Sequence, residues 1–323
     1  MKKLSLFIFF CMFLSIKINC TNYSIIYVHL GDSLPDYLLD SVKQTRLFNE
    51  NASIFIVCCK KNIEIVSSVM NALHVHLIAN EELPITDAHE RFLKKIKFCG
   101  LFKFSIERFF YIEQVIKKYK LKNIFHLEND NLLYINLEDY ISIFENNYKG
   151  IAATFDNDHR CIPGFVYIND CLAISKLNKF SSFITELNFS DMYILGKFRN
   201  KYPEHIDNLP IIPSSYKRYY ELKNLNNEKS FFEERYSKNF NLFNSIFDAA
   251  ALGQYLGGLD PINVNFQPGF INESCIFNPA KFAHEWMMDE KARKVPFIKF
   301  NNELYRINNL HIHCKNLKKF VSL

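Results

Sequence analysis

The chain has 323 residues, 49% hydrophobic and 23% charged, an ordinary composition for a globular protein that folds on its own. Its formal net charge of +5 comes from Lys and Arg scattered along the sequence, and without a basic block nucleic acid is not an expected partner. Nine cysteines without a Cys-x-x-Cys pair exclude a disulfide scaffold and disfavour zinc. We expect most thiols to be small core residues, with one or two disulfides left open.

The amino terminus has the pattern of a secretory signal. Two lysines precede an apolar run over residues 4–16, and Lys17 follows it. This pattern predicts a signal peptide over residues 1–20. The run is shorter than the roughly 20 residues of a membrane-spanning helix, although a short anchor is the alternative. We expect the secretory pathway or export, with membrane contact only through this segment if it is not cleaved.

Strand and helix patterns alternate through the first half of the chain. The expected order is strand, helix, strand, helix, strand, at residues 24–30, 36–48, 53–58, 61–70 and 74–79. This is the beginning of a βαβαβ unit with a parallel sheet. The loop after the first strand lies where a nucleotide usually meets such a sheet. Gly31, in that loop, and His29, near the end of the strand, are therefore candidate nucleotide-sugar-binding residues.

The pattern continues with a helix and two strands up to residue 155. The second half of the chain is less regular. The expected helices are at 105–120, 175–187, 191–200 and 247–256, and the strands at 123–127, 150–155 and 164–168. Gly257 and Gly258 form the stop signal of the last helix. No linker divides the chain, so we predict a single catalytic domain over 21–323. Its nucleotide-binding half is 21–155, and its acceptor half is 156–323.

An acidic cluster follows the strand that ends at Leu127, in the segment NIFHLENDNLLY. Open α/β sheets bind ligands at the carboxyl ends of their strands. On an extended backbone Glu128 and Asp130 point to the same side, where carboxylate oxygens suit Mg²⁺ or Mn²⁺ held against nucleotide phosphates. The alternative is that Asn129 and its neighbours only build a turn.

A second cluster, Leu-His-Ile-His-Cys-Lys, ends the chain's last apolar segment. On a strand His311 and His313 would share one face. If that strand lies beside the acidic one, a histidine completes the coordination of a metal at Asp130, and Lys315 neutralises phosphate oxygens. The alternative is a hydrogen-bonded core histidine and a solvated lysine.

Together these segments resemble the nucleotide-sugar-dependent glycosyltransferases of the GT-A type, over most of residues 22–319. The resemblance rests on YVHLGDSLPDYLLDSVKQTRLFN, FSIERFFYIEQVIKKYKLKNIFHLENDNLLY, FDAAALGQYLGGLDP and NNLHIHCKNLKKF. It implies that Asp130, the last acid of a DxD-like motif, binds the metal, and that Glu128 contacts ribose or metal. Here Glu replaces the first Asp, and Asn129 stands between. Glycogenin-like members further imply His313 or His311 as a metal ligand and Lys315 on the diphosphate.

Three more residues are candidates for the chemistry. Arg108, in the helix before the acidic strand, is either a phosphate contact or an exposed helix residue. Asp248 is either the catalytic carboxylate facing acceptor or sugar, or the cap of the helix expected at 247–256. Asp156, after the strand at 150–155, is the second catalytic candidate.

The expected fold is α/β and GT-A-like: one Rossmann-like nucleotide-binding sheet with helices on both faces and an irregular carboxy-terminal acceptor region. The expected function is a metal-dependent glycosyltransferase that uses Mn²⁺ or Mg²⁺. Its partners are a nucleotide-diphosphate sugar donor and a glycan, lipid or protein acceptor. The alternatives are a secreted carbohydrate- or nucleotide-sugar-binding protein without turnover, and a nucleotide-sugar phosphohydrolase.

Overall fold

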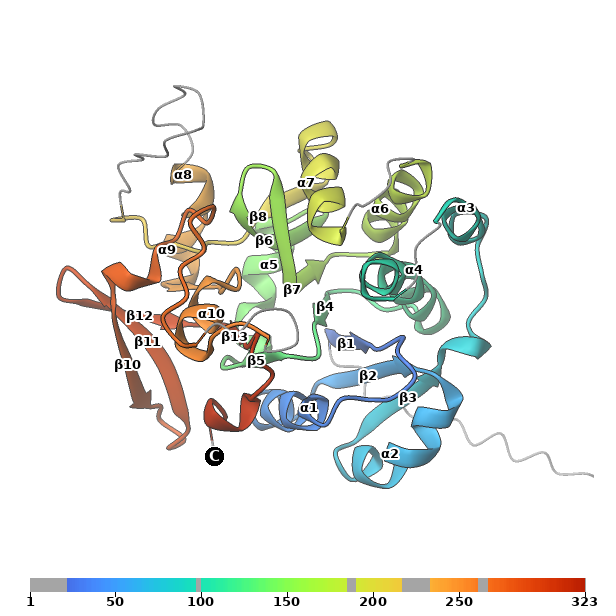
Figure 1. Ribbon diagram of the computed structural model, residues 1–323, viewed down its shortest axis with the longest axis horizontal. Helices are drawn as coiled ribbons and strands as arrows, with labels where there is room; N and C mark the ends of the chain where they lie inside the picture. Colours follow the sequence, from blue (N-terminus) through green and yellow to red (C-terminus); the bar gives the residue numbers. More distant parts are fainter. Residues whose placement is uncertain (1–21, 97–99, 185–189, 217–232, 261–266, 323) are drawn as a thin grey trace, which may run out of the picture.

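The computed structural model describes residues 22–96, 100–184, 190–216, 233–260 and 267–322 (Figure 1). The predicted signal peptide lies outside these residues. Within them, no helix combines the length and apolarity that crossing a bilayer requires. The cysteines in these ranges are all free thiols, of which Cys58, Cys161 and Cys275 are buried and Cys59, Cys171 and Cys314 are partly buried.

The central element is a seven-stranded sheet in the order β3-β2-β1-β4-β7-β6-β8. Strands β1 to β4 run parallel, β7 is antiparallel to both β4 and β6, and β8 is parallel to β6. The bounds, from β1 to β4 and then β6 to β8, are Ser24–Val28, Ser53–Cys58, Val75–Ala79, Ile124–Leu127, Ile151–Asn157, Arg160–Ile168 and Ile206–Asn208. The predicted strands all lie in this sheet, which confirms the α/β fold class.

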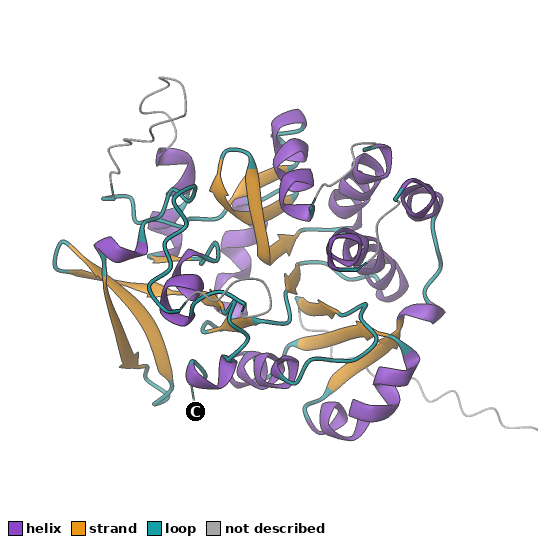
Figure 2. Ribbon diagram, in the orientation of Figure 1, coloured by secondary structure: helices purple, strands orange, loops and turns teal. Residues whose placement is uncertain are grey.

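Helices cover both faces of this sheet (Figure 2). Along β1, Ile25 and Tyr27 belong to one buried core, and Ile26 and Val28 belong to the other. Such burial of every strand residue explains why the strand reads as a continuous apolar run. Side chains of α1, α2 and α5 pack in the first core, and those of α3, α4, α6 and α7 in the second. In the order given, these helices are Tyr37–Phe48, Lys60–Ala72, Ile141–Asn147, Asp87–Lys95, Leu101–Tyr119, Cys171–Phe183 and Asp191–Lys201.

Two smaller sheets contain strands that the sequence pattern did not predict or predicted only in part. One is a four-stranded sheet in the order β10-β11-β12-β9, with bounds Ala283–Met288, Lys294–Phe300, Glu303–Ile307 and Ser245–Ile246. The other pairs β13 (Asn309–His311) with β5 (Asn131–Leu133) in antiparallel register. The chain then returns to α1, where the Gln44 side chain donates to Ser322 at 2.7 Å. Figure 1 shows the carboxyl end beside α1.

Some predicted boundaries are wrong. The helix expected at 105–120 begins earlier, at Leu101, and the one expected at 175–187 begins at Cys171, because Asp170 caps it by accepting from two backbone amides. The helix expected at 247–256 is α10, Ala251–Gly257. It begins four residues later than expected and ends one residue later, and Gly258, with φ +87°, terminates it. Shorter helices are α8 (Glu233–Tyr236) and α9 (Phe240–Phe243).

Candidate metal and nucleotide site

The carboxyl ends of β1 and β4 lie side by side because these two strands are parallel neighbours. His29 follows β1, and its Nδ1 accepts from the Asn129 side chain at 3.0 Å while its Nε2 donates to the Ser33 carbonyl at 2.8 Å. A Cβ on Gly31 would lie only 2.8 Å from that ring. The nucleotide-binding candidates His29, Gly31 and Asn129 therefore lie at one sheet edge, next to the acidic cluster.

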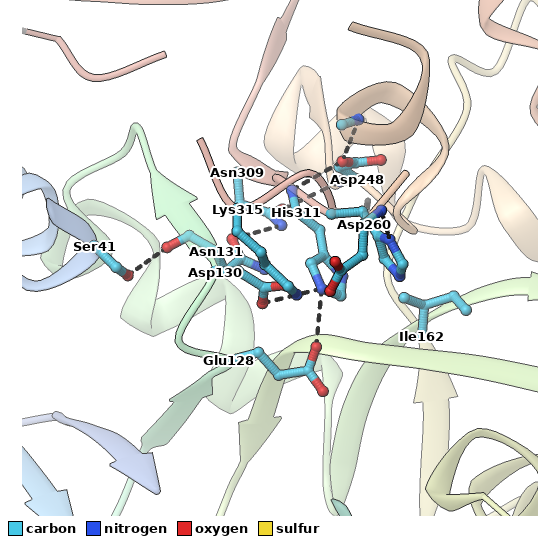
Figure 3. Close-up of polar contacts among 12 residues, drawn as sticks. Ser41, Glu128, Asp130, Asn131, Ile162, Asp248, Asp260, Asn309, His311 and Lys315 are labelled. Carbon is cyan, nitrogen blue, oxygen red and sulfur yellow. Dashed lines mark hydrogen bonds and ion pairs between the residues drawn. The ribbon is translucent and has the colours of Figure 1, made fainter. Parts of the chain in front are cut away.

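Glu128 and Asp130 converge on His311 (Figure 3). The backbone turns after β4, with the Asn131 amide donating to the Glu128 carbonyl at 3.0 Å, and β5 then pairs with β13 so that His311 faces Asn131. His311 Nε2 lies 3.0 Å from Glu128 Oε2 and 3.2 Å from Asp130 Oδ1. The two carboxylates share a side through this turn and not through an extended strand, so the predicted reason for their convergence is wrong.

This group has the donors that a divalent cation requires. One ligand atom from each of Glu128, Asp130 and His311 lies within 4.8 Å of the other two, and the side chains are largely buried. Two carboxylate oxygens and one imidazole nitrogen are donors that divalent cations accept. The residues therefore fit a divalent cation.

The electrostatics of the group show how strongly it attracts positive charge. Burial disfavours the charged form of His311, but Asp130 and Glu128 outweigh burial and raise its pKa to about 10. Against the same burial, Arg108 and His311 hold the pKa of Glu128 below its usual range, and His311 with Lys315 does so for Asp130. A proton on His311 thus occupies the centre that a cation would take.

Lys315 donates to Asp130 Oδ2, on the carboxylate oxygen that does not face His311. Its backbone is left-handed, with φ +63°, and its side chain is 30% exposed. A cavity of about 290 Å³ adjoins it, lined by Tyr37, other residues of the α1 start and residues 314–318. Lys315 is therefore both paired with the acidic cluster and within reach of a ligand in this cavity.

His313 lies outside the ligand group. The strand β13 ends at His311, and the chain turns, so the two histidines do not share a strand face. His313 Nδ1 instead accepts from the Asp260 amide at 3.1 Å. Burial and the nearby charge of His311 lower its pKa to about 4, which keeps it neutral. Of the two predicted histidines, the structure brings only His311 to the carboxylates.

Arg108 is neither exposed nor free for a phosphate. It lies on α4 at 7% exposure, and its guanidinium pairs with Glu128 at 2.5 Å and with Asp191. Asp191, the first residue of α7, was not a candidate from the sequence, because 83 residues separate it from Arg108. Its only sequence signal is an acidic residue in the first turn of a helix. The pair fixes the orientation of Glu128.

Replacing Asp191 with Asn should destabilise the protein by about 3 kcal/mol, because it removes one charge from a buried ion pair. Urea denaturation would measure this loss. Asp87→Asn, at the exposed start of α3, is the matched control and should change stability by less than about 0.5 kcal/mol. Equal free energies of unfolding for the two variants would show that the ion pair between Arg108 and Asp191 does not stabilise the fold.

The carboxylate of Asp248 accepts hydrogen bonds from backbone amides. At 1% exposure, its carboxylate accepts from the amides of Leu252 and Gly253, each at 2.9 Å, and of His311 at 3.0 Å. Burial raises its pKa. This geometry favours the capping alternative over a catalytic carboxylate, and the cap also holds His311 in place.

Asp156, the other catalytic candidate, is fully buried in β6 and pairs with Arg160. Arg160 Nε lies 3.1 and 3.0 Å from its two oxygens. Burial raises the pKa of Asp156, against the lowering effect of Arg160. The structure therefore does not bring Asp156 to the ligand group, and its contacts are those of a structural ion pair.

Gly164 of β7 allows His311 to approach the sheet. A Cβ at this position would lie 2.7 Å from His311 Nδ1 and 2.8 Å from Asn131 Nδ2. Both neighbours are buried. Gly164→Ala should therefore cost about 1–3 kcal/mol of stability by overpacking and displace the His311 ring. Denaturation and Mn²⁺ titration by calorimetry would measure the two effects, and wild-type values in both would show that the ring is not held by this contact.

No family model matches the sequence, and no curated protein matches it either. Similar solved structures include mouse xyloside xylosyltransferase 1 in its apo form, at 11% identity over 58% of this chain and 85% of that one, with a TM-score of 0.40. The PaToxG glycosyltransferase is 10% identical over 56% of this chain and 69% of that one, with a TM-score of 0.41. A cytidylyltransferase from Leptospira borgpetersenii is 12% identical over 59% of this chain and 76% of that one, with a TM-score of 0.38. These identities and TM-scores are too low to support a statement about function.

Proposed function

We propose that this protein is a metal-dependent glycosyltransferase that moves a sugar from a nucleotide-diphosphate sugar to a glycan, lipid or protein acceptor. The convergence of Glu128, Asp130 and His311 at the carboxyl ends of β1 and β4 carries this proposal. Ligands of open α/β sheets bind at that edge. A cation site there meets the phosphates of a nucleotide donor.

The proposed cation is Mn²⁺ or Mg²⁺, held by Asp130 and His311 with Glu128 as the third ligand. When bound, it would stabilise the negative charge that develops on the departing nucleoside diphosphate. Arg108 holds Glu128 from behind, and Asp248 holds the backbone of His311, so both ligands are preorganised. His311 must lose its proton to coordinate through Nε2.

Lys315 is proposed to contact the diphosphate. Its ammonium group now neutralises Asp130, and a cation on that carboxylate would free it to turn toward phosphate oxygens. Its partial exposure and the adjoining cavity support this role. His29 and Asn129, fixed by their mutual hydrogen bond, are proposed to contact the nucleotide.

A product assay tests the function. The purified protein is incubated with UDP-, GDP-, TDP- and ADP-sugars with and without Mn²⁺, and the products are identified by mass spectrometry. We expect slow Mn²⁺-dependent release of nucleoside diphosphate and free sugar, because water replaces the missing acceptor. Sugar phosphate with nucleoside monophosphate would instead indicate a phosphohydrolase. Binding without turnover for every donor would indicate a binding protein.

A further inference from the structure

A second cavity, of about 450 Å³, lies between α6 and the carboxyl end of α7 and shares no lining residue with the site around Asp130. Its volume is within the roughly 300–1,000 Å³ of small-molecule sites. Aromatic rings form its apolar part: the Phe180 centroid lies 5.5 Å from that of Phe198 and 5.9 Å from that of Tyr202. Figure 1 shows the two helices side by side.

Three lysines surround these rings. Lys176 and Lys179 lie three residues apart on α6 and so share a face, and Lys201 Nζ lies 5.4 Å from the Tyr202 ring centroid. Lys176 Nζ also donates to His205 Nε2 at 2.8 Å. Each of these groups brings N–H donors to one concave surface.

The described part of the chain supplies no carboxylate partner to these lysines. Other lysines have one, such as Lys94 with Glu90 and Lys117 with Glu113. The acidic residue Glu204, next to the cavity, is 61% exposed and lies 3.2 Å from His205 Nε2, the atom that accepts from Lys176, so it makes no hydrogen bond there. Three like charges around an apolar hollow repel one another, and an anion between them relieves that repulsion.

We propose that this cavity is a second ligand site, which binds a small phosphate monoester or carboxylate carried on an aromatic or aliphatic body. The lysines bind the anionic group by charge-assisted hydrogen bonds. Phe180 and Tyr202 bury the apolar body. The site is independent of the proposed transfer reaction, since the two share no residue.

Calorimetric titration with phenyl phosphate in EDTA tests the site, since EDTA removes any anion binding through a metal. We expect phenyl phosphate to bind at least about tenfold more tightly than inorganic phosphate, because only the ester buries a ring. Lys176→Met and Lys201→Met should each weaken binding at least about fivefold. Lys118→Met, an exposed lysine of α4, should not change it.

Three outcomes would overturn the proposal. The first is equal affinity in Lys176→Met, Lys201→Met and the wild type, with circular dichroism showing all of them folded. The second is loss of binding in Lys315→Met alone, which would place the anion in the other cavity. The third is binding to anionic phospholipid vesicles without binding of phenyl phosphate, which would indicate a membrane surface.

Discussion

Replacing Asp130 with Asn is expected to abolish metal-stimulated turnover of the nucleotide-sugar donor. Mutating a residue that only hydrogen-bonds to a metal ligand typically lowers metal affinity or activity about 10–100-fold. Mutating a ligand itself should therefore lower activity at least about 100-fold. Asp130 contacts both His311 and Lys315, and no other described carboxylate does so at ion-pair distance. Initial rates with and without Mn²⁺ measure the effect.

Stability should change far less than activity in this variant. Lys315 is 30% exposed and can hydrate, and His311 can release its proton once one carboxylate is lost. We expect the thermal midpoint to fall by only a few degrees. Asp139→Asn, an exposed carboxylate after β5, is the control and should keep full activity. A Mn²⁺-stimulated Asp130→Asn enzyme would remove the proposed metal site.

Mn²⁺ binding is expected to release about one proton at neutral pH, because His311 is protonated without metal and must be neutral when it coordinates. Mn²⁺ affinity should therefore rise about tenfold per pH unit below the His311 pKa. Calorimetry in buffers of different ionisation enthalpy counts the proton. His311→Gln should bind Mn²⁺ weakly and without proton release, while His313→Gln should resemble the wild type.

Folding stability without metal should show the opposite trend with pH. The folded pKa of His311, about 10, exceeds its ordinary value of 6.5, so its protonated form favours the folded state. This contribution is fully present below the ordinary value and is lost as the pH rises through about 10. Urea denaturation across this range measures it. If the His311→Gln variant kept the same dependence of unfolding free energy on pH, another group would be responsible for it.

Local pattern was sufficient for much of the sheet. Strands β1, β2 and β4 are buried along their whole length and mainly apolar because both faces are covered, and β1 and β4 end next to polar residues. The rule that ligands meet parallel strands at their carboxyl ends then placed His29 and Glu128 at the same edge. The meander β10 to β12 has partly exposed faces, which weakens any such signal.

The choice between the two histidines could not come from pattern. In the sequence His311 and His313 differ only in position, and alternation makes them equivalent on a strand. The end of β13 at His311 depends on pairing with β5, about 180 residues away, and on the turn that follows. The same applies to Arg108, whose partner Asp191 lies on another helix.

The sequence by itself determined the α/β order of strands and helices and the residue types of the candidate cation site, because both follow from neighbours along the chain. Only the tertiary structure decided which side chains meet. Strand pairing brings Glu128 and Asp130 to His311. Arg108 pairs with Asp191. Asp248 accepts from backbone amides, and Asp156 pairs with Arg160. Such contacts depend on the free energy of packing distant segments, which no local pattern encodes.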